Sequence, residues 1–192
     1  IDVEEDSHRD SQRTGPSRFQ CLKERNGMKP PSFSTRHLND WNARLYLKLG
    51  GKARIYAINS SGETRNQALR DALVFRGARR ELFPDAIIDE NKFENYEGLT
   101  TFTYIKLCTS GPDEMKTRIL EYLDRIYQNS SYVWGYGFVH GALYAYLLDD
   151  KGFDFKQIHV PDFDLGSAAL EVYGVTLPEV CRDVAGSLAM SY

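Results

Sequence analysis

The feature that most constrains this chain is one long apolar stretch near its middle. Residues 132–148 read YVWGYGFVHGALYAYLL and contain no Lys, Arg, Asp or Glu. A membrane-spanning helix needs about 20 consecutive apolar residues. This stretch is shorter, and it holds three glycines and His140. We therefore expect it to lie in the middle of a protein core, as a pair of buried strands or a strand and a short helix, and we expect no membrane span.

The length of 192 residues suits a single domain with an appendage. Residues 1–33 are mostly polar, mixed in charge and interrupted by Gly15-Pro16 and Pro30-Pro31. Such a segment buries too little apolar surface to offset the cost of ordering it. We therefore predict an extended or disordered N-terminal arm over 1–33, followed by one domain over 34–192.

Helical periodicity is clearest over residues 113–128. Pro112 suits a first helical position, Asp113 and Glu114 complement a helix N-terminus, and the apolar residues that follow share one face. Similar spacing predicts three further helices, over 37–49, 63–73 and about 178–190. Gly50-Gly51 is expected to end the first of these, and 78–83 is expected to form one or two helical turns.

Several short segments are instead rich in β-branched and aromatic residues, which are typical of strands. They are residues 54–58, 74–77, 99–107, 153–160 and 170–175, while 85–97 resembles a loop. Strands and helices do not alternate regularly along the chain. This order favours an α+β fold over a doubly wound α/β fold.

Charge and cysteine content exclude some functions. The net charge of −3 lacks the electrostatic footprint of a general nucleic-acid binder. The three cysteines are far apart and form no CxxC pair, so we expect no metal site and a reducing environment.

Three segments carry candidate functional residues. Arg76 precedes the final glycine of the segment VFRG, residues 74–77. There its guanidinium fork can reach a diphosphate while Gly77 lets the chain turn away. Thr101 and Thr103 would share one face of a strand and orient a catalytic side chain. Gln157 would share a face with Phe155 and His159 in the strand FKQIHVPDF.

In this order the segments resemble the R-S-E class of mono-ADP-ribosyltransferases, which includes bacterial toxins, secreted effectors and vertebrate ecto-enzymes. That family has an arginine in a short strand, then a Ser-Thr-Ser-like strand, then a Glu-x-Glu strand. The resemblance implies a mostly antiparallel, strongly bent sheet flanked by helices. It also implies an NAD-binding enzyme that expels nicotinamide, with Arg76 and Gly77 holding the cofactor and Thr101 and Thr103 orienting the active-site group.

The chain departs from the family at the catalytic glutamate, where Gln157 stands. Glutamine supplies no negative charge to an oxocarbenium-like transition state, and losing such a group typically costs about 3–4 kcal/mol of barrier. Either Glu171 is the catalytic residue or the protein is a degenerate member that binds without turnover. The resemblance further implies a secreted effector that acts in a reducing host cytoplasm, with NAD or an arginine-containing protein as its partner.

Two other functions fit the same sequence. Cys21, His140 and one of Asp154, Asp162 and Asp164 follow the Cys-His-Asp order of papain-like proteases, with 138–155 as a histidine hairpin. A non-enzymatic protein-interaction domain with a tyrosine-rich groove fits the twelve tyrosines equally well.

Overall fold

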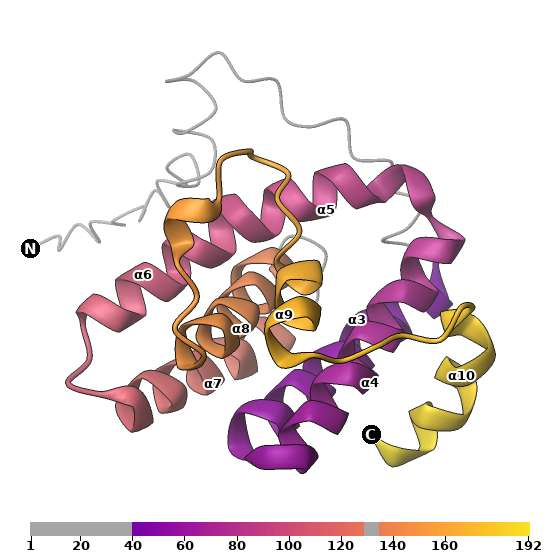
Figure 1. The fold of residues 1–192 in the computed structure, drawn as a ribbon, viewed down its shortest axis with the longest axis horizontal. Coiled ribbons are helices and arrows are strands. Elements are labelled where there is room, and N and C mark those ends of the chain that lie inside the picture. Colours follow the sequence, from indigo (N-terminus) through magenta and orange to yellow (C-terminus); the bar gives the residue numbers. More distant parts are fainter. Residues whose placement is uncertain (1–39, 129–134) are drawn as a thin grey trace, which may run out of the picture. The chain divides into compact units, whose positions relative to one another are not determined.

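The computed structural model describes residues 40–128 and 135–192, all within the compact unit Ser34–Tyr192. Every regular element in these ranges is helical (Figure 1). The predicted α+β fold and its bent sheet are therefore wrong, because the described part of the chain contains no strand. The predicted arm, residues 1–33, lies outside the described residues.

The helices follow one another along the chain, with the longest described connection between Asp150 and Leu165. In chain order they are α3 (Trp41–Asn59), α4 (Gly62–Leu82), the 3₁₀ turn η1 (Pro84–Ala86), α5 (Ile87–Phe93), the π-helix η2 (Glu94–Leu99), α6 (Thr100–Leu107), α7 (Pro112–Tyr127), α8 (Tyr136–Asp150), the 3₁₀ turn η4 (Phe155–Gln157), α9 (Leu165–Tyr173), α10 (Cys181–Leu188) and the 3₁₀ turn η5 (Ala189–Ser191).

The apolar stretch was predicted to form a pair of strands or a strand and a short helix, but its residues 136–148 form most of the central helix α8. Most of its side chains are buried, on every side of the helix. A helix that is hydrophobic all round must be enclosed by protein, and α8 contacts α3, α5, η2, α6, α7 and α9. The stretch lies in the core as expected, but in a different secondary structure. None of the described helices is long and apolar enough to cross a membrane.

Glycines in α8 allow a neighbouring helix to approach its backbone. A Cβ on Gly141 would collide with the backbone of Glu94 and Gly98, and a Cβ on Gly137 would collide with the ring of Phe93. These glycines therefore serve close helix packing and mark no turn between strands.

The segments α5, η2 and α6 run end to end as one helical path from Ile87 to Leu107. The predicted loop over 85–97 and the predicted strand over 99–107 are both wrong. The π-helical turn in the middle is the segment that packs most closely on α8. Such turns are frequent at functional sites.

Helices α3 and α4 pack against each other along their length (Figure 1). The predicted strands 54–58 and 74–77 lie inside them. Small buried residues recur four positions apart in each helix, namely Ala53 and Ala57 in α3 and Ala68 and Ala72 in α4. Gly50-Gly51 does not end α3 but lies buried within it.

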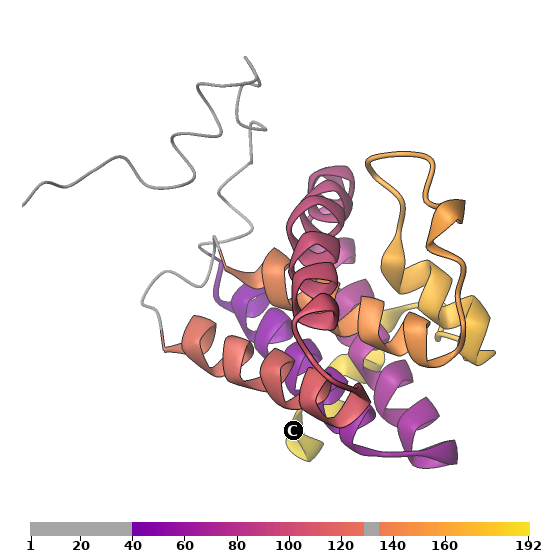
Figure 2. The ribbon, with the colours of Figure 1, turned by 90° about the vertical axis from the view of Figure 1, so that its left-hand side faces the viewer.

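Of the remaining sequence predictions, the two helices are confirmed and the two strands are wrong. Helix α7 confirms the prediction for 113–128, and α10 with η5 confirms a final helix. The predicted strand 153–160 is a 3₁₀ turn within a loop, and 170–175 overlaps the end of α9. Residues 151–164 leave α8, loop outward and return to α9 (Figure 2). Phe155 of this loop stacks on Phe102 of α6.

Candidate functional site, a buried arginine-lined pocket

Helix α4 directs three arginines to one side. Arg76, Arg79 and Arg80 are three and four positions apart, so they share a face of the helix. Glu90 and Glu94, also four apart, face them from the α5–η2 path. The two helices thus meet through charged side chains in the protein interior.

Each arginine of α4 has a carboxylate partner. Arg76 donates to Glu94 at 2.5 Å and to Asp164 at 3.0 Å. Arg79 pairs with Glu90, and Arg80 donates to Asp164 at 2.5 Å. Removing one member of a buried ion pair strongly destabilises a protein, because the other charge is left buried and unpaired. These pairs therefore fix the relative position of the helices that carry them.

The same network holds the loop that precedes α9. Asn91 donates to the carbonyl of Asp162 at 3.1 Å, and Asn95 donates to the carbonyls of Pro161 and Phe163 at 2.9 and 2.7 Å. Asp164 caps α9 by accepting from the backbone N–H of Ser167 at 3.0 Å.

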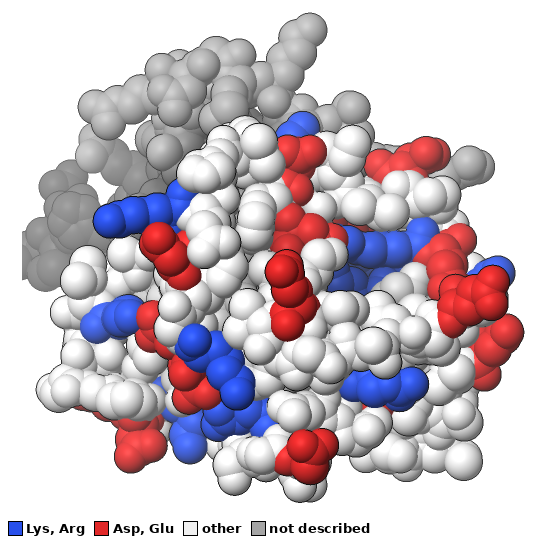
Figure 3. Space-filling view, in the orientation of Figure 1, with Lys and Arg blue, Asp and Glu red and all other residues white. Residues whose placement is uncertain are grey.

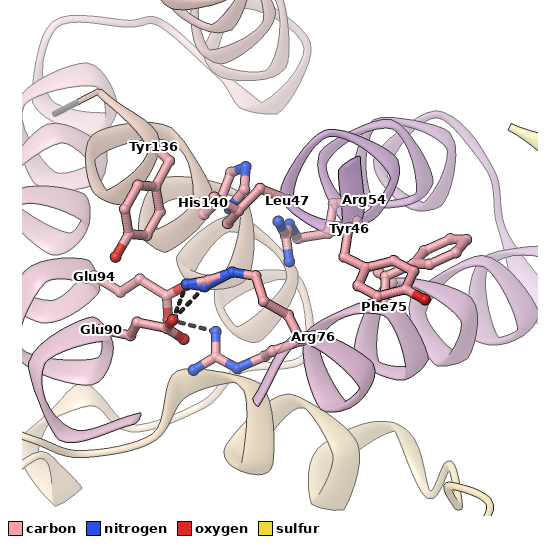
Figure 4. A pocket seen from close by; sticks show the side chains of 12 residues that line it. Tyr46, Leu47, Arg54, Phe75, Arg76, Glu90, Glu94, Tyr136 and His140 are labelled. Carbon is pink, nitrogen blue, oxygen red and sulfur yellow. Dashed lines mark hydrogen bonds and ion pairs between the residues drawn. The ribbon is translucent and has the colours of Figure 1, made fainter. Parts of the chain in front are cut away.

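A pocket opens between α3, α4, η2 and α8 beside this network (Figure 4). Its free volume is about 20 Å³, close to the space that a single water molecule needs. Its lining combines charged and aromatic groups, namely Arg54, Arg76, Arg79, Glu90, Glu94, His140, Tyr46, Phe75 and Tyr136. On the molecular face in Figure 3, basic and acidic side chains are intermixed, and one group of basic side chains lies in a hollow flanked by acidic ones.

Arg54 differs from the other arginines of the pocket. It is only 2% exposed, yet no described carboxylate lies within ion-pair distance of it. Its Nη1 donates to the hydroxyl of Tyr144 at 2.7 Å, and its guanidinium lies 4.6 Å from the centre of that ring. Its Nε has no hydrogen-bond partner among the described residues. The other buried carboxylate, Asp71, instead accepts from Gln67 and Tyr192.

His140 and Tyr136 bring neutral polar groups to the pocket. Burial, together with the positive charges of Arg54, Arg79 and Arg76, holds the pKa of His140 well below its usual value of 6.5. Burial raises the pKa of Tyr136 to about 12, and its hydroxyl lacks a hydrogen-bond partner in the described structure. At neutral pH the pocket therefore contains an uncharged imidazole and an uncharged phenol.

Burial and the neighbouring carboxylates shift the pKa values of the pocket arginines in different directions. Burial by itself lowers the pKa of Arg76, but Glu94 and Asp164 outweigh it and raise that pKa above its usual value. Burial dominates at Arg79 and lowers its pKa to about 10. Arg76 and Arg80 in turn hold the pKa of Asp164 below its usual value, against the opposing effect of burial.

Of the residues predicted for the ADP-ribosyltransferase site, the structure brings only Arg76 into this pocket. Thr101 is buried on α6, whereas Thr103 is exposed there, because residues two apart in a helix cannot share a face. Gln157 and Glu171 are exposed on η4 and α9. The predicted shared face of Thr101 and Thr103 is therefore wrong.

Gly77 lies inside α4 and marks no turn of the chain. A Cβ there would collide with the sulfur of Cys181 from α10. For the protease alternative, Cys21 lies outside the described residues, His140 is on α8 and not on a hairpin, and Asp164 belongs to the arginine network. Asp154 is exposed and caps η4, and Asp162 lies in the loop before α9.

Sequence reasoning missed Arg54, Glu90, Glu94 and Tyr144. The repeat ENKFEN, residues 90–95, could have indicated the two glutamates, because two Glu-Asn pairs four positions apart lie on one face of a helix. Tyr144 lies beside Arg76, whose guanidinium is 5.1 Å from the ring centre of Tyr144.

Comparison of the chain with protein-family models, with curated proteins and with solved structures found no match. Among the described residues, no group of three or more His, Cys, Asp or Glu is arranged to hold a metal ion. The ADP-ribosyltransferase activity, the NAD cofactor and the protein-interaction alternative remain predictions from the sequence.

Proposed function

We propose that this helical domain binds a small anionic molecule in the pocket between α3, α4, η2 and α8. The observation that carries the proposal is Arg54, a buried guanidinium with no carboxylate partner among the described residues. A buried charge is costly unless it is paired. A bound anion would supply the missing partner.

The charges around the pocket support this assignment. Four guanidinium groups meet three carboxylates in the described network, and His140 is neutral, so one positive charge is in surplus. The residues in this count are Arg54, Arg76, Arg79, Arg80, Glu90, Glu94 and Asp164.

Several buried donors along the pocket lack a hydrogen-bond partner among the described residues, among them Nε of Arg76 and Nε and Nη2 of Arg79. The Nε of Arg54 and the hydroxyl of Tyr136 are buried and have no partner in the described structure. Arg54 from α3 and His140 from α8 both line the pocket, whereas the hydroxyl of Tyr136 points toward Glu94 (Figure 4). An anion beside Arg54 could accept from its unused Nε.

The test compares Tyr144→Phe with the double variant Arg54→Met/Tyr144→Phe. The double variant removes the charge and the hydroxyl it bonds, so no buried donor or acceptor of this pair is left alone. Thermal unfolding is followed while phosphate, acetate or benzoate is added at constant ionic strength.

We expect at least one anion to raise the melting temperature of the wild type and of Tyr144→Phe saturably. The double variant should show no such rise. An equal response in the double variant, or no saturable response of the wild type to any of these anions, would contradict the proposal.

A further inference from the structure

We infer that residues 181–192 form a clasp that undocks from α3 and α4 as one unit while the rest of the domain stays folded. The clasp comprises α10, η5 and Tyr192. This inference is independent of the anion pocket. Its supports are the linker before the clasp, the one-sided packing of α10, and separate polar contacts at the two ends of the clasp.

The clasp follows a linker without regular structure. Residues 174–180, all of them described, form neither helix nor strand and run from α9 to α10 (Figure 1). None of these residues is buried. Arg70 of α4 donates to the carbonyl of Thr176 at 3.1 Å, in a hydrogen bond that is exposed to solvent. Segments with few buried contacts and exposed hydrogen bonds open at low free energy, so the linker can move with the clasp.

Helix α10 is packed on one side only. It lies mainly against α4, and only Cys181 and Ala185 of the helix are buried. On another side, no described atom outside α10 lies within 4 Å of a Cβ added at Gly186. A helix of eight residues is not stable alone in water, where even about 12–15 residues are marginal. We therefore expect α10 to lose its helical structure whenever it undocks.

Contacts from α4 fix the start of the clasp. The carboxylate of Glu81 accepts from the backbone N–H of Cys181 at 2.7 Å and from that of Arg182 at 3.2 Å. The first N–H groups of a helix have no partner within the helix itself, so this carboxylate satisfies two of them. The sulfur of Cys181 packs against Gly77, where an added Cβ would collide with it. Undocking therefore brings this sulfur into solvent.

Tyr192 fixes the other end of the clasp. Its hydroxyl donates to the buried carboxylate of Asp71 at 3.0 Å, and its carbonyl accepts from Nζ of Lys52 at 2.8 Å. Its ring meets that of Phe75 edge to face, with the ring centres 5.9 Å apart. Both hydrogen bonds involve an ionised group, which makes them stronger than hydrogen bonds between neutral groups.

Undocking uncovers an apolar face on α3 and α4. The cluster on which the clasp packs is buried in the docked state and consists of Leu49, Ala53, Ala72, Val74, Phe75 and Ala78. Soluble monomers rarely expose large contiguous apolar patches. The docked clasp thus keeps this face out of water, and its release makes the face accessible.

The thiol of Cys181 provides the test, because it is buried in the docked clasp. Cys108 is exposed, so the double variant Cys21→Ser/Cys108→Ser leaves Cys181 as the single thiol. Its labelling by a thiol-reactive aromatic disulfide is followed at increasing urea below the unfolding transition, which far-UV circular dichroism records. We expect the free energy of opening to fall with urea at most about a fifth as steeply as that of global unfolding, since this slope scales with the surface exposed.

Tyr192→Phe in the same background shows whether the clasp moves as a unit. It removes a hydroxyl at the end of the clasp opposite the reporter thiol. Loss of a hydrogen bond to an ionised group in the docked state should make the labelling of Cys181 at least about tenfold faster. Met190→Ala is the matched control, because Met190 lies in the clasp and is 89% exposed. It should be labelled at the rate of the background protein.

A shallow urea dependence together with faster labelling of Tyr192→Phe supports the clasp. Two results would overturn it. An unchanged labelling rate in Tyr192→Phe would mean that Tyr192 detaches without releasing α10. A urea dependence as steep as that of global unfolding would mean that Cys181 is exposed only when the whole domain unfolds.

Discussion

At the scale of single residues, Arg54 and Arg79 have the same burial and different surroundings. Both are 2% exposed. Arg79 pairs with Glu90, whereas Arg54 donates to a neutral hydroxyl. A buried cation with a buried carboxylate holds two helices together. A buried cation without a carboxylate partner could pair with an anionic ligand. Such a cation lowers the stability of the protein when no ligand is bound.

This contrast predicts opposite effects on stability. Arg79→Met leaves Glu90 desolvated, with Arg80 as its remaining partner at 3.3 Å. We expect a loss of about 3 kcal/mol in the free energy of unfolding, the lower end for a broken buried pair. Arg54→Met/Tyr144→Phe should unfold at a urea midpoint no lower than that of the wild type. Urea denaturation of both variants measures this, and equal losses in the two would show that the arginines have the same role.

At the scale of elements, amphipathic helices were predictable and enclosed helices were not. Helix α7 is exposed on one side, so its apolar residues recur every three to four positions and identify it. Helix α8 is covered on every side, so its sequence lacks that periodicity. Its Tyr and Val residues then favour strands by propensity, which the enclosing helices override.

The candidate site was likewise predictable only in part from the sequence. Arg76 could be chosen from the sequence because it stands in a short apolar segment. Its partners come from distant parts of the chain, and Glu94 is 18 positions away and Asp164 is 88. Their proximity depends on how the helices pack, and local patterns do not encode that packing.

Packing between η2 and α8 is expected to fail when Gly141 gains a side chain. The Cβ of Gly141→Ala would overlap the backbone of Glu94 and Gly98, which cannot rotate away as a side chain can. We expect a loss of about 2–3 kcal/mol in the free energy of unfolding, despite the gain in helix propensity. Gly186→Ala, measured by the same urea denaturation, is the control that should be neutral or stabilising. A Gly141→Ala protein as stable as the wild type would mean that the two helices do not meet so closely.

At the scale of the whole domain, the interior is organised around charge as well as apolar surface. Helices α3 and α4 from the first half and α8 and α9 from the second half all contribute to one connected set of polar contacts. The stability of the domain therefore depends on the ionisation of its interior, and pH acts on all these helices together.

His140 makes this dependence measurable near neutral pH. Its pKa in the folded protein is well below 6.5 because of burial and of Arg54, Arg79 and Arg76. Above pH 6.5 the imidazole is neutral in both the folded and the unfolded protein, so it does not make the free energy of unfolding depend on pH. Below pH 6.5 the unfolded chain takes up a proton that the folded protein does not, so the free energy of unfolding should fall by up to about 1.4 kcal/mol per pH unit. Asp164 adds a second loss only below its usual value of 3.8, since its folded pKa is lower still.

Urea denaturation at pH 7.5, 6.5, 5.5 and 4.5 measures the contribution of His140 above the pH at which Asp164 begins to contribute. We expect the wild type to lose stability progressively from pH 6.5 downward, and His140→Gln to lose less over the interval between pH 6.5 and 4.5. His159 is exposed and serves as the matched control, so His159→Gln should follow the wild type. The two glutamine variants differ only in whether the replaced imidazole lies among the arginines of the pocket. Parallel curves for the wild type and His140→Gln would therefore show that the positive interior does not keep His140 neutral.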